Sequence, residues 1–119
     1  MNDSQPIYTQ VMEIVENGII SGVWGEGELI ISTTQISRLY NVNPTTAVKA
    51  ISRLTDDGLL YKRPGIGMCV AEGAREKLLT RRKADFLGGA LDGFLAEART
   101  LNISTEHLIK LIKERGIHD

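Results

Sequence analysis

The chain has 119 residues, enough for one small domain with an appendage but too few for a separate ligand-binding domain of ordinary size. Its 42% hydrophobic and 24% charged residues are typical of a soluble globular protein, and no run of 18 apolar residues predicts a membrane span. The net charge of −1 is unevenly distributed, because residues 1–37 carry −5, residues 38–83 carry +6 and residues 84–119 carry −2.

The first predicted helix runs from Pro6 to Ser21. Apolar side chains at helical spacing are expected to face the core, and these are Tyr8, Val11, Met12, Val15 and Ile19. The glycine-rich segment 22–27 lacks the Lys-Ser/Thr of a phosphate-binding loop and precedes a strand pattern. We therefore interpret this segment as a connector, with Trp24 packed against a small sheet that includes residues 29–31.

Two short helices come next, and each begins with a capping pattern. Ser32 is followed three residues later by Gln35, which is the spacing of a capping box. Asn43 precedes Pro44, so a strong N-cap residue stands before a proline at the first helical position. The second of these helices is expected to cover residues 44–57. The pair is typical of a helix-turn-helix motif.

This second helix has an apolar and a polar side when its residues are placed at 100° intervals. The apolar side carries Ala47, Ala50, Ile51 and Leu54, with Val48 and Thr55 on its flank. The polar side carries Thr45, Thr46, Lys49, Ser52, Arg53 and Asp56. Such an arc suits a recognition helix in a major groove, although any surface helix also has a solvated polar side.

A strand pair punctuated by glycine follows directly. Residues 59–63 and 68–71 are predicted strands, joined by a turn at 64–67, and the first strand carries Lys62 and Arg63. The +6 segment is the charge expected of a surface that binds nucleic acid, although its part at 81–83 is more simply a solvated helix face. The order of elements predicts a winged helix-turn-helix domain over residues 1–71, in a chain that is mainly α with a small β-sheet.

These residues resemble the GntR family of bacterial transcription regulators, and within it the small YtrA-type subfamily. The similarity covers the first helix (6–11), the entry to the first strand (27–30), the recognition helix (42–50) and the wing (58–68). Each piece is weak alone, but their order within 70 residues is specific. The resemblance implies a transcription regulator that represses its own operon, often one that encodes an ABC transporter.

Two departures from the family pattern affect the expected DNA contacts. The family usually has Leu-Pro-Ser-x-Arg where this chain has residues 30–34, so an arginine that contacts the DNA backbone is replaced by Thr34. A neutral hydrogen bond from a hydroxyl is roughly half as strong as a charge-assisted one. An arginine often found in the wing is also missing beside Gly65. We therefore expect weaker or less salt-dependent binding than in a typical member.

The resulting hypothesis is a sequence-specific regulator that binds a pseudo-palindromic operator in double-stranded DNA as a homodimer, with helix 44–57 in the major groove. The leading contacts are expected from Thr45, Thr46, Lys49 and Arg53. Other contacts, to the backbone or a minor groove, are expected from Ser32, Thr34, Lys62, Arg63 and Gly65. Asn43 is ambiguous, because a side chain that caps a helix is not free to read a base.

Beyond a break at residues 72–73, residues 74–101 form one predicted helix, and a last helix begins after Ser104 and ends at Gly116. Their apolar sides cannot be buried within this short segment alone, so they must pack on the winged helix or on a second copy. The resemblance implies the second arrangement, a helical dimerisation tail over 74–119. The expected interface residues are Leu87, Leu91, Phe94, Leu95, Ala98, Leu108, Leu111 and Ile112.

Three glycines within the long predicted helix, Gly88, Gly89 and Gly93, each cost about 1 kcal/mol relative to alanine. Close helix approach across the dimer, a bend, and a cavity for a small effector would each explain them, and we favour the first two. The sequence identifies no effector.

No catalytic site, metal site or cofactor is expected. His107 and His118 have no second ligand at a metal-like spacing, and no nucleophile–base arrangement is recognisable. Cys69 is expected to be buried and to pack in the core; a role as a redox switch is less favoured. A single cysteine excludes an internal disulfide, and residues 1–5 lack the pattern of a secretory signal, so we expect a cytoplasmic protein. Because no catalytic arrangement is recognisable, we also expect that it is not an enzyme.

Two other functions remain open. One is a winged-helix adaptor for protein–protein contacts, which the missing arginine at Thr34 favours and an exposed apolar patch would reveal. The other is a sensing module whose tail binds a small molecule around residues 88–94 and touches DNA only secondarily.

Overall fold

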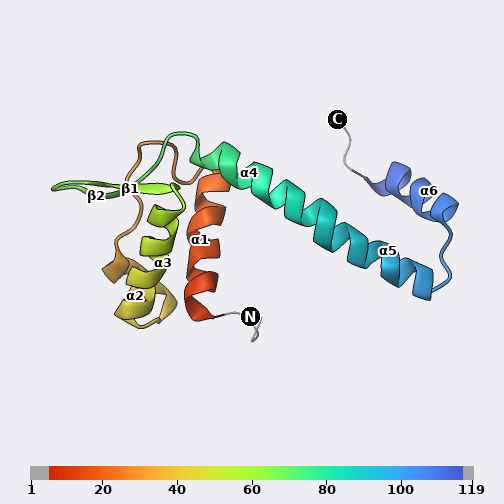
Figure 1. Cartoon of the computed structure of the whole chain (residues 1–119), viewed down its shortest axis with the longest axis horizontal. Coiled ribbons are helices and arrows are strands. Elements are labelled where there is room, and N and C mark those ends of the chain that lie inside the picture. The colour runs from red at the N-terminus through yellow and green to blue at the C-terminus, as the bar shows by residue number, and fades with distance from the viewer. Residues whose placement is uncertain (1–5, 117–119) are drawn as a thin grey trace. The chain divides into compact units, whose positions relative to one another are not determined.

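The computed structural model describes residues 6–116, and the chain divides into two units, Met1–Thr80 and Arg81–Asp119 (Figure 1). Its elements in chain order are α1 (Ile7–Ser21), α2 (Thr33–Tyr40), α3 (Pro44–Asp56), β1 (Leu60–Arg63), β2 (Gly67–Val70), α4 (Ala74–Asp85), the π-helical turn η1 (Phe86–Ala90), α5 (Leu91–Thr100) and α6 (Thr105–Arg115). This mainly helical chain with one two-stranded sheet confirms the predicted fold class.

The core of the first unit lies among its helices and the hairpin. α1 and α3 lie side by side, and α2 packs against α3 (Figure 1). Every element of the unit contributes a buried side chain, including Val15, Ile36, Leu54, Val70 and Leu78. Burial of these residues from segments far apart in the sequence is the main stabilisation of the unit.

Both predicted helix starts are confirmed. Ser32 Oγ accepts a hydrogen bond from the Gln35 N–H at 3.1 Å, and Gln35 Oε1 accepts one from the Ser32 N–H at 2.8 Å, which completes the capping box. Asn43 Oδ1 accepts from the Thr45 N–H at 2.8 Å, with Pro44 at the first helical position. These bonds satisfy N–H groups that a helix start leaves without partners, and they fix where α2 and α3 begin.

The turn between α2 and α3 is held by a backbone conformation and a side-chain bond. Asn41 is left-handed (φ 50°) at the end of α2, a geometry that asparagine tolerates better than most residues. Ser37 Oγ donates a hydrogen bond to the carbonyl oxygen of Val42 at 2.6 Å. Together they hold the start of α3 against the end of α2.

The hairpin of β1 and β2, here called the wing, pairs Leu60 with Val70 and Arg63 with Gly67. The expected pairing of residues 29–31 with the wing is present, but it is limited to one bridge and does not extend into a strand. Leu29 forms a single antiparallel bridge with Cys69 on β2, next to a hydrogen bond from the Ile30 N–H to the Met68 carbonyl oxygen. Pairing stops there because the chain reaches the cap of α2 at once.

The Trp24 ring lies against α1. The sequence predicts instead that it packs against the sheet. A Cβ added at Gly18 would collide with the Trp24 ring, so the ring fills the space that a side chain would need. The backbone N–H of Trp24 also donates to the Gly18 carbonyl oxygen at 3.2 Å. The glycine in α1 is thus explained by close approach of an aromatic ring.

The boundary between the units differs from the predicted break at residues 72–73. Ala74 and Leu78, in the first turns of α4, are buried in the core of the first unit, so the division falls after Thr80. The backbone stays helical from Ala74 to Thr100, but it widens into the π turn.

The π turn contains Gly88 and Gly89, and Gly93 follows in α5. A Cβ at any of these three glycines would meet nothing within 4 Å. Packing against another described segment of the same chain therefore does not explain them. In the last helix, Ser104 Oγ accepts from the His107 N–H at 3.1 Å, which confirms the predicted N-cap of α6.

Replacing Ser32 with alanine should lower the free energy of unfolding by about 1 kcal/mol, because the Gln35 N–H loses its acceptor. Thr34→Ala is the matched control: it removes an exposed hydroxyl inside α2, where alanine is a better helix former, so stability should hold or rise. Urea unfolding followed by Trp24 fluorescence measures both variants. Equal destabilisation by the two would contradict the capping role.

Candidate nucleic-acid interface

The polar side of α3 faces solvent. Its exposed residues are Thr45, Lys49, Ser52, Arg53 and Asp56, and Thr46 is half-buried. The opposite side is buried in the core through Ala47, Ala50, Ile51 and Leu54. The predicted division of this helix is therefore confirmed except at Val48, which is exposed, and the surface that the helix presents is mainly polar with a cationic edge.

Tyr8 of α1 supports that cationic edge. The Nζ of Lys49 lies 4.2 Å from the centre of the Tyr8 ring, and the Cζ of Arg53 lies 5.7 Å from it. Both distances are within the range of a cation–π contact. Tyr8 is half-buried, so the residue expected only as core also carries two cations on its ring.

The contacts with Tyr8 determine on which side of α3 the charged groups of Lys49 and Arg53 lie. Lys49 and Arg53 stand one turn apart on α3, and both lean toward α1. Their positive charge is thus concentrated along one edge of the helix and not spread across its outward face. A cationic edge of this kind is suited to the phosphates that line a groove.

The start of α3 places hydroxyl groups near the helix N-terminus. Thr45 is exposed, and the positive end of the helix dipole favours an anion there. Asn43 is exposed as well, but its Oδ1 is committed to the cap. Because the amide oxygen of Asn43 is already bonded within the protein, that oxygen is not free to read a base.

The wing adds a second group of exposed polar positions. Lys62 and Arg63 are exposed on β1, and Gly65 occupies the turn with φ 77°, a conformation that favours glycine. Ile66 beside it is 54% exposed. The tip of the wing therefore presents backbone and the two apolar side chains of Pro64 and Ile66, with the cations behind it.

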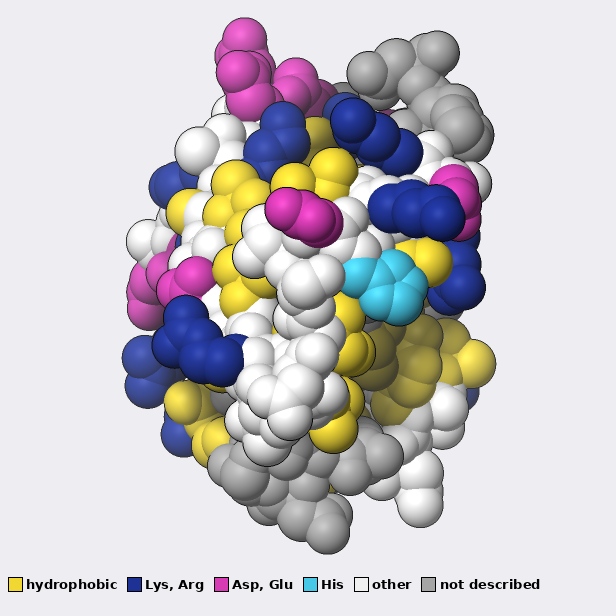
Figure 2. All heavy atoms as spheres, turned by 90° about the vertical axis from the view of Figure 1, so that its right-hand side faces the viewer, with side chains coloured by type: hydrophobic (Ala, Val, Ile, Leu, Met, Phe, Trp, Pro, Cys, Tyr) yellow, Lys and Arg dark blue, Asp and Glu magenta, His cyan; other side chains and the backbone are white. Residues whose placement is uncertain are grey.

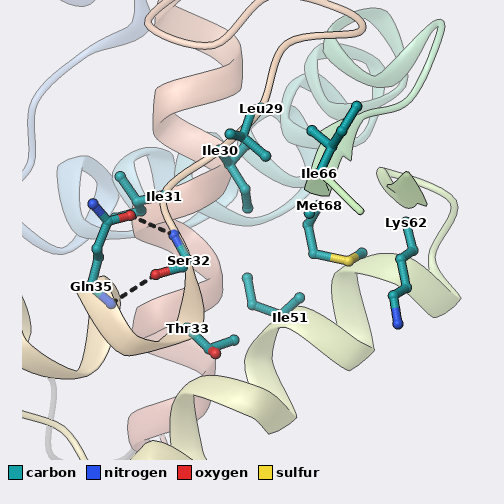
Figure 3. A pocket seen from close by; sticks show the side chains of 11 residues that line it. Leu29, Ile30, Ile31, Ser32, Thr33, Gln35, Ile51, Lys62, Ile66 and Met68 are labelled. Carbon is teal, nitrogen blue, oxygen red and sulfur yellow. Dashed lines mark hydrogen bonds between the residues drawn. The ribbon is translucent and has the colours of Figure 1, made fainter. Parts of the chain in front are cut away.

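A hollow of about 280 Å³ lies between the wing, the segment 29–33 and α3 (Figure 3). Its lining is mainly apolar, with Ser32 and Gln35 on one side and Lys62 on the other. The Ser32 N–H donates to Gln35 and its Oγ accepts from the Gln35 N–H, so its O–H is the group left to donate to a phosphate. Thr34 is exposed, and the polar group that its side chain offers is a hydroxyl.

Among residues 6–116, no group of three His, Cys, Asp or Glu side chains is placed to hold a metal ion. Cys69 is buried in β2, as expected for packing, and His118 lies outside the described residues. The described helices include none that combines the length and apolar character needed to cross a membrane.

Residues 7–70 match the model of the bacterial regulatory proteins of the gntR family. The match covers more than half of the chain and contains α1, the helix-turn-helix and the wing. The chain belongs to the GntR family. It is a DNA-binding transcription regulator with a winged helix-turn-helix, as the resemblance predicted, and transcription regulators of this kind are not enzymes.

Relatives extend the likeness beyond the family domain. The HTH-type transcriptional repressor YtrA of Bacillus subtilis is 25% identical over 111 residues, which cover 93% of this chain and 85% of that protein. A GntR-family regulator from Listeria monocytogenes has the same fold, with a TM-score of 0.72, 24% identity, and coverage of 96% and 98% of the two chains. The DNA-binding domain of AraR in complex with operator ORR3 has 33% identity and a TM-score of 0.53, over 56% of this chain and 80% of that one.

The contact between Tyr8 and Lys49 should appear as an energetic coupling. In a double-mutant cycle of Tyr8→Leu and Lys49→Ala, urea unfolding should give a favourable coupling of about 0.5 kcal/mol, the size of an exposed cation–π contact. Tyr40→Leu is the matched control, an exposed tyrosine on α2, and its coupling to Lys49→Ala should be near zero. Strict additivity in both cycles would show that the ring does not hold the cation.

Proposed function

We propose that this GntR-family protein is a cytoplasmic repressor that binds a pseudo-palindromic operator as a homodimer, and that it represses its own operon. Relatives named as repressors support this proposal, among them YtrA and the histidine utilization repressor of Klebsiella aerogenes. The latter is matched over only 28% of its length, so its likeness concerns the family domain. The AraR complex supports an operator as the target.

One observation carries the proposal most directly, the cationic edge of α3 next to its outward polar face. Lys49 and Arg53 are held by Tyr8 along that edge, while Thr45 and Ser52 remain exposed beside them. In the proposed complex the face enters the major groove and the edge meets phosphates. Thr46, Lys62, Arg63 and Gly65 add contacts to the backbone or the minor groove.

Residues 74–119 would serve as the dimerisation tail, and residues 1–71 would hold the DNA. Apolar side chains gather on the face of α5 and α6 that Figure 2 shows, with Lys and Arg around them. Several residues expected at the interface are exposed in the single chain, namely Leu87, Phe94, Leu95 and Ile112. Phe86 and Leu101 are exposed too, although the sequence did not place them there. A second copy would bury this apolar surface.

Ala98 differs from the other expected interface residues in the single chain. The residue is only 6% exposed, and its carbonyl oxygen accepts a hydrogen bond from the Ile103 N–H. Leu91, Leu108 and Leu111 are half-buried. In the proposed dimer the more exposed members of the set offer a partner the larger apolar area.

DNA binding is tested by fluorescence anisotropy on labelled DNA from the upstream region of the gene, with unrelated DNA as competitor. The proposal predicts a preference of about a hundredfold or more for the upstream DNA. Lys49→Ala and Arg53→Ala should each weaken binding to both DNAs and lower the slope of log K against log salt by about 0.9. Lys110→Ala, an exposed lysine on α6, is the charge-matched control and should change neither quantity.

Equal and weak binding to the two DNAs would contradict the operator proposal and favour the adaptor function. Normal specific binding by both Lys49→Ala and Arg53→Ala would show instead that another surface holds the DNA. Unchanged thermal midpoints in these variants separate lost contacts from lost folding.

Dimerisation is tested by light scattering coupled to size exclusion. Phe94→Asp should convert the dimer to a monomer, because it places a charge in the surface proposed to be buried. Phe94 is 48% exposed in the single chain, so the charge would still be in contact with water in the monomer. Ala96→Asp adds the same charge to the other side of α5 and should leave the dimer intact. A dimer that survives Phe94→Asp would exclude this face.

A further inference from the structure

Val48 is an apolar side chain on the part of α3 that faces solvent. It is 51% exposed and does not belong to the buried core, although the sequence placed it on the apolar flank. Its neighbours one turn away on the same side are Thr45 and Ser52, both exposed. About half of this apolar side chain therefore stays in contact with water in the single chain.

Val48 and the two cations lie on different parts of the exposed surface of α3, with Lys49 about 100° around the axis from Val48. Arg53 lies about 140° around the axis from Val48, at 100° per residue. Lys49 and Arg53 lean toward Tyr8 on α1, so Val48 is on the edge of the outward face that is away from them. Next to Val48 the exposed surface of α3 carries the hydroxyls of Thr45 and Ser52, while Lys49, Arg53 and Asp56 lie further round the helix.

These groups limit which base edges the face can recognise. In the major groove every base presents hydrogen-bonding groups, and thymine adds its C5-methyl group, the largest apolar group there. The valine side chain has no donor or acceptor, and covering a polar edge without a partner carries a desolvation cost. The thymine methyl group is therefore the feature of the groove that suits a valine side chain best.

We propose that Val48 is a specificity-determining residue that contacts the C5-methyl group of a thymine in each half-site of the operator. This inference rests on the proposed insertion of α3 into the major groove, and it adds the base that the operator carries there. Thr45 and Ser52 flank the contact and offer hydroxyls to the neighbouring base edges or phosphates.

The test replaces thymines of the bound upstream duplex one at a time with deoxyuridine, which removes only the C5-methyl group. One position in each half-site should lose about fourfold in affinity, the amount expected for one buried methyl group. In Val48→Ala this loss should disappear, while thymines at other positions behave as before. Alanine at an exposed helix position favours the fold, so the variant remains a test of contact.

Leu39→Ala is the matched control, because Leu39 is an apolar residue on α2 that is 68% exposed. It should leave the deoxyuridine profile of the wild type unchanged. A flat profile in a protein that still prefers its upstream DNA would overturn the thymine contact and leave the operator proposal intact. A loss that persists in Val48→Ala would also overturn it, and the absence of any specific binding would overturn both proposals.

Discussion

The close packing of α3 against its neighbours governs the rest of the first unit. Ala47 and Ala50 are completely buried and extend no further than Cβ, so α3 can approach α1 and α2 closely. This short separation brings Tyr8 beneath Lys49 and Arg53, and it turns the polar side of α3 outward. The surface proposed to meet DNA is thus a consequence of which residues the core can accommodate.

Local signals allowed the start of each short helix to be predicted from sequence. Ser32 with Gln35, and Asn43 with Pro44, are short-range patterns whose hydrogen bonds join residues two or three positions apart. The division of α3 into two sides was also predictable, because helical periodicity alone determines it. The candidate DNA-binding residues on α3 and the wing are correspondingly exposed, except for the half-buried Thr46.

Features that depend on long-range contacts were not predictable in the same way. The cation–π cluster joins Tyr8 to residues more than 40 positions later, and nothing in the local sequence pairs them. Residues 29–31 have strand propensity, but the cap of α2 limits them to one bridge. Val48 was placed on an apolar flank because periodicity gives an angle on the helix and not the depth of the core on that side.

The central claim is that two copies of α3 enter major grooves on one face of the same duplex. Hydroxyl-radical footprinting of the upstream DNA, combined with dimethyl sulfate protection, measures this directly. We expect two protected patches whose centres are about 10 base pairs, or a multiple of that, apart, with guanine N7 protected within them where guanines occur. A single patch, or protection confined to the minor groove, would contradict the claim.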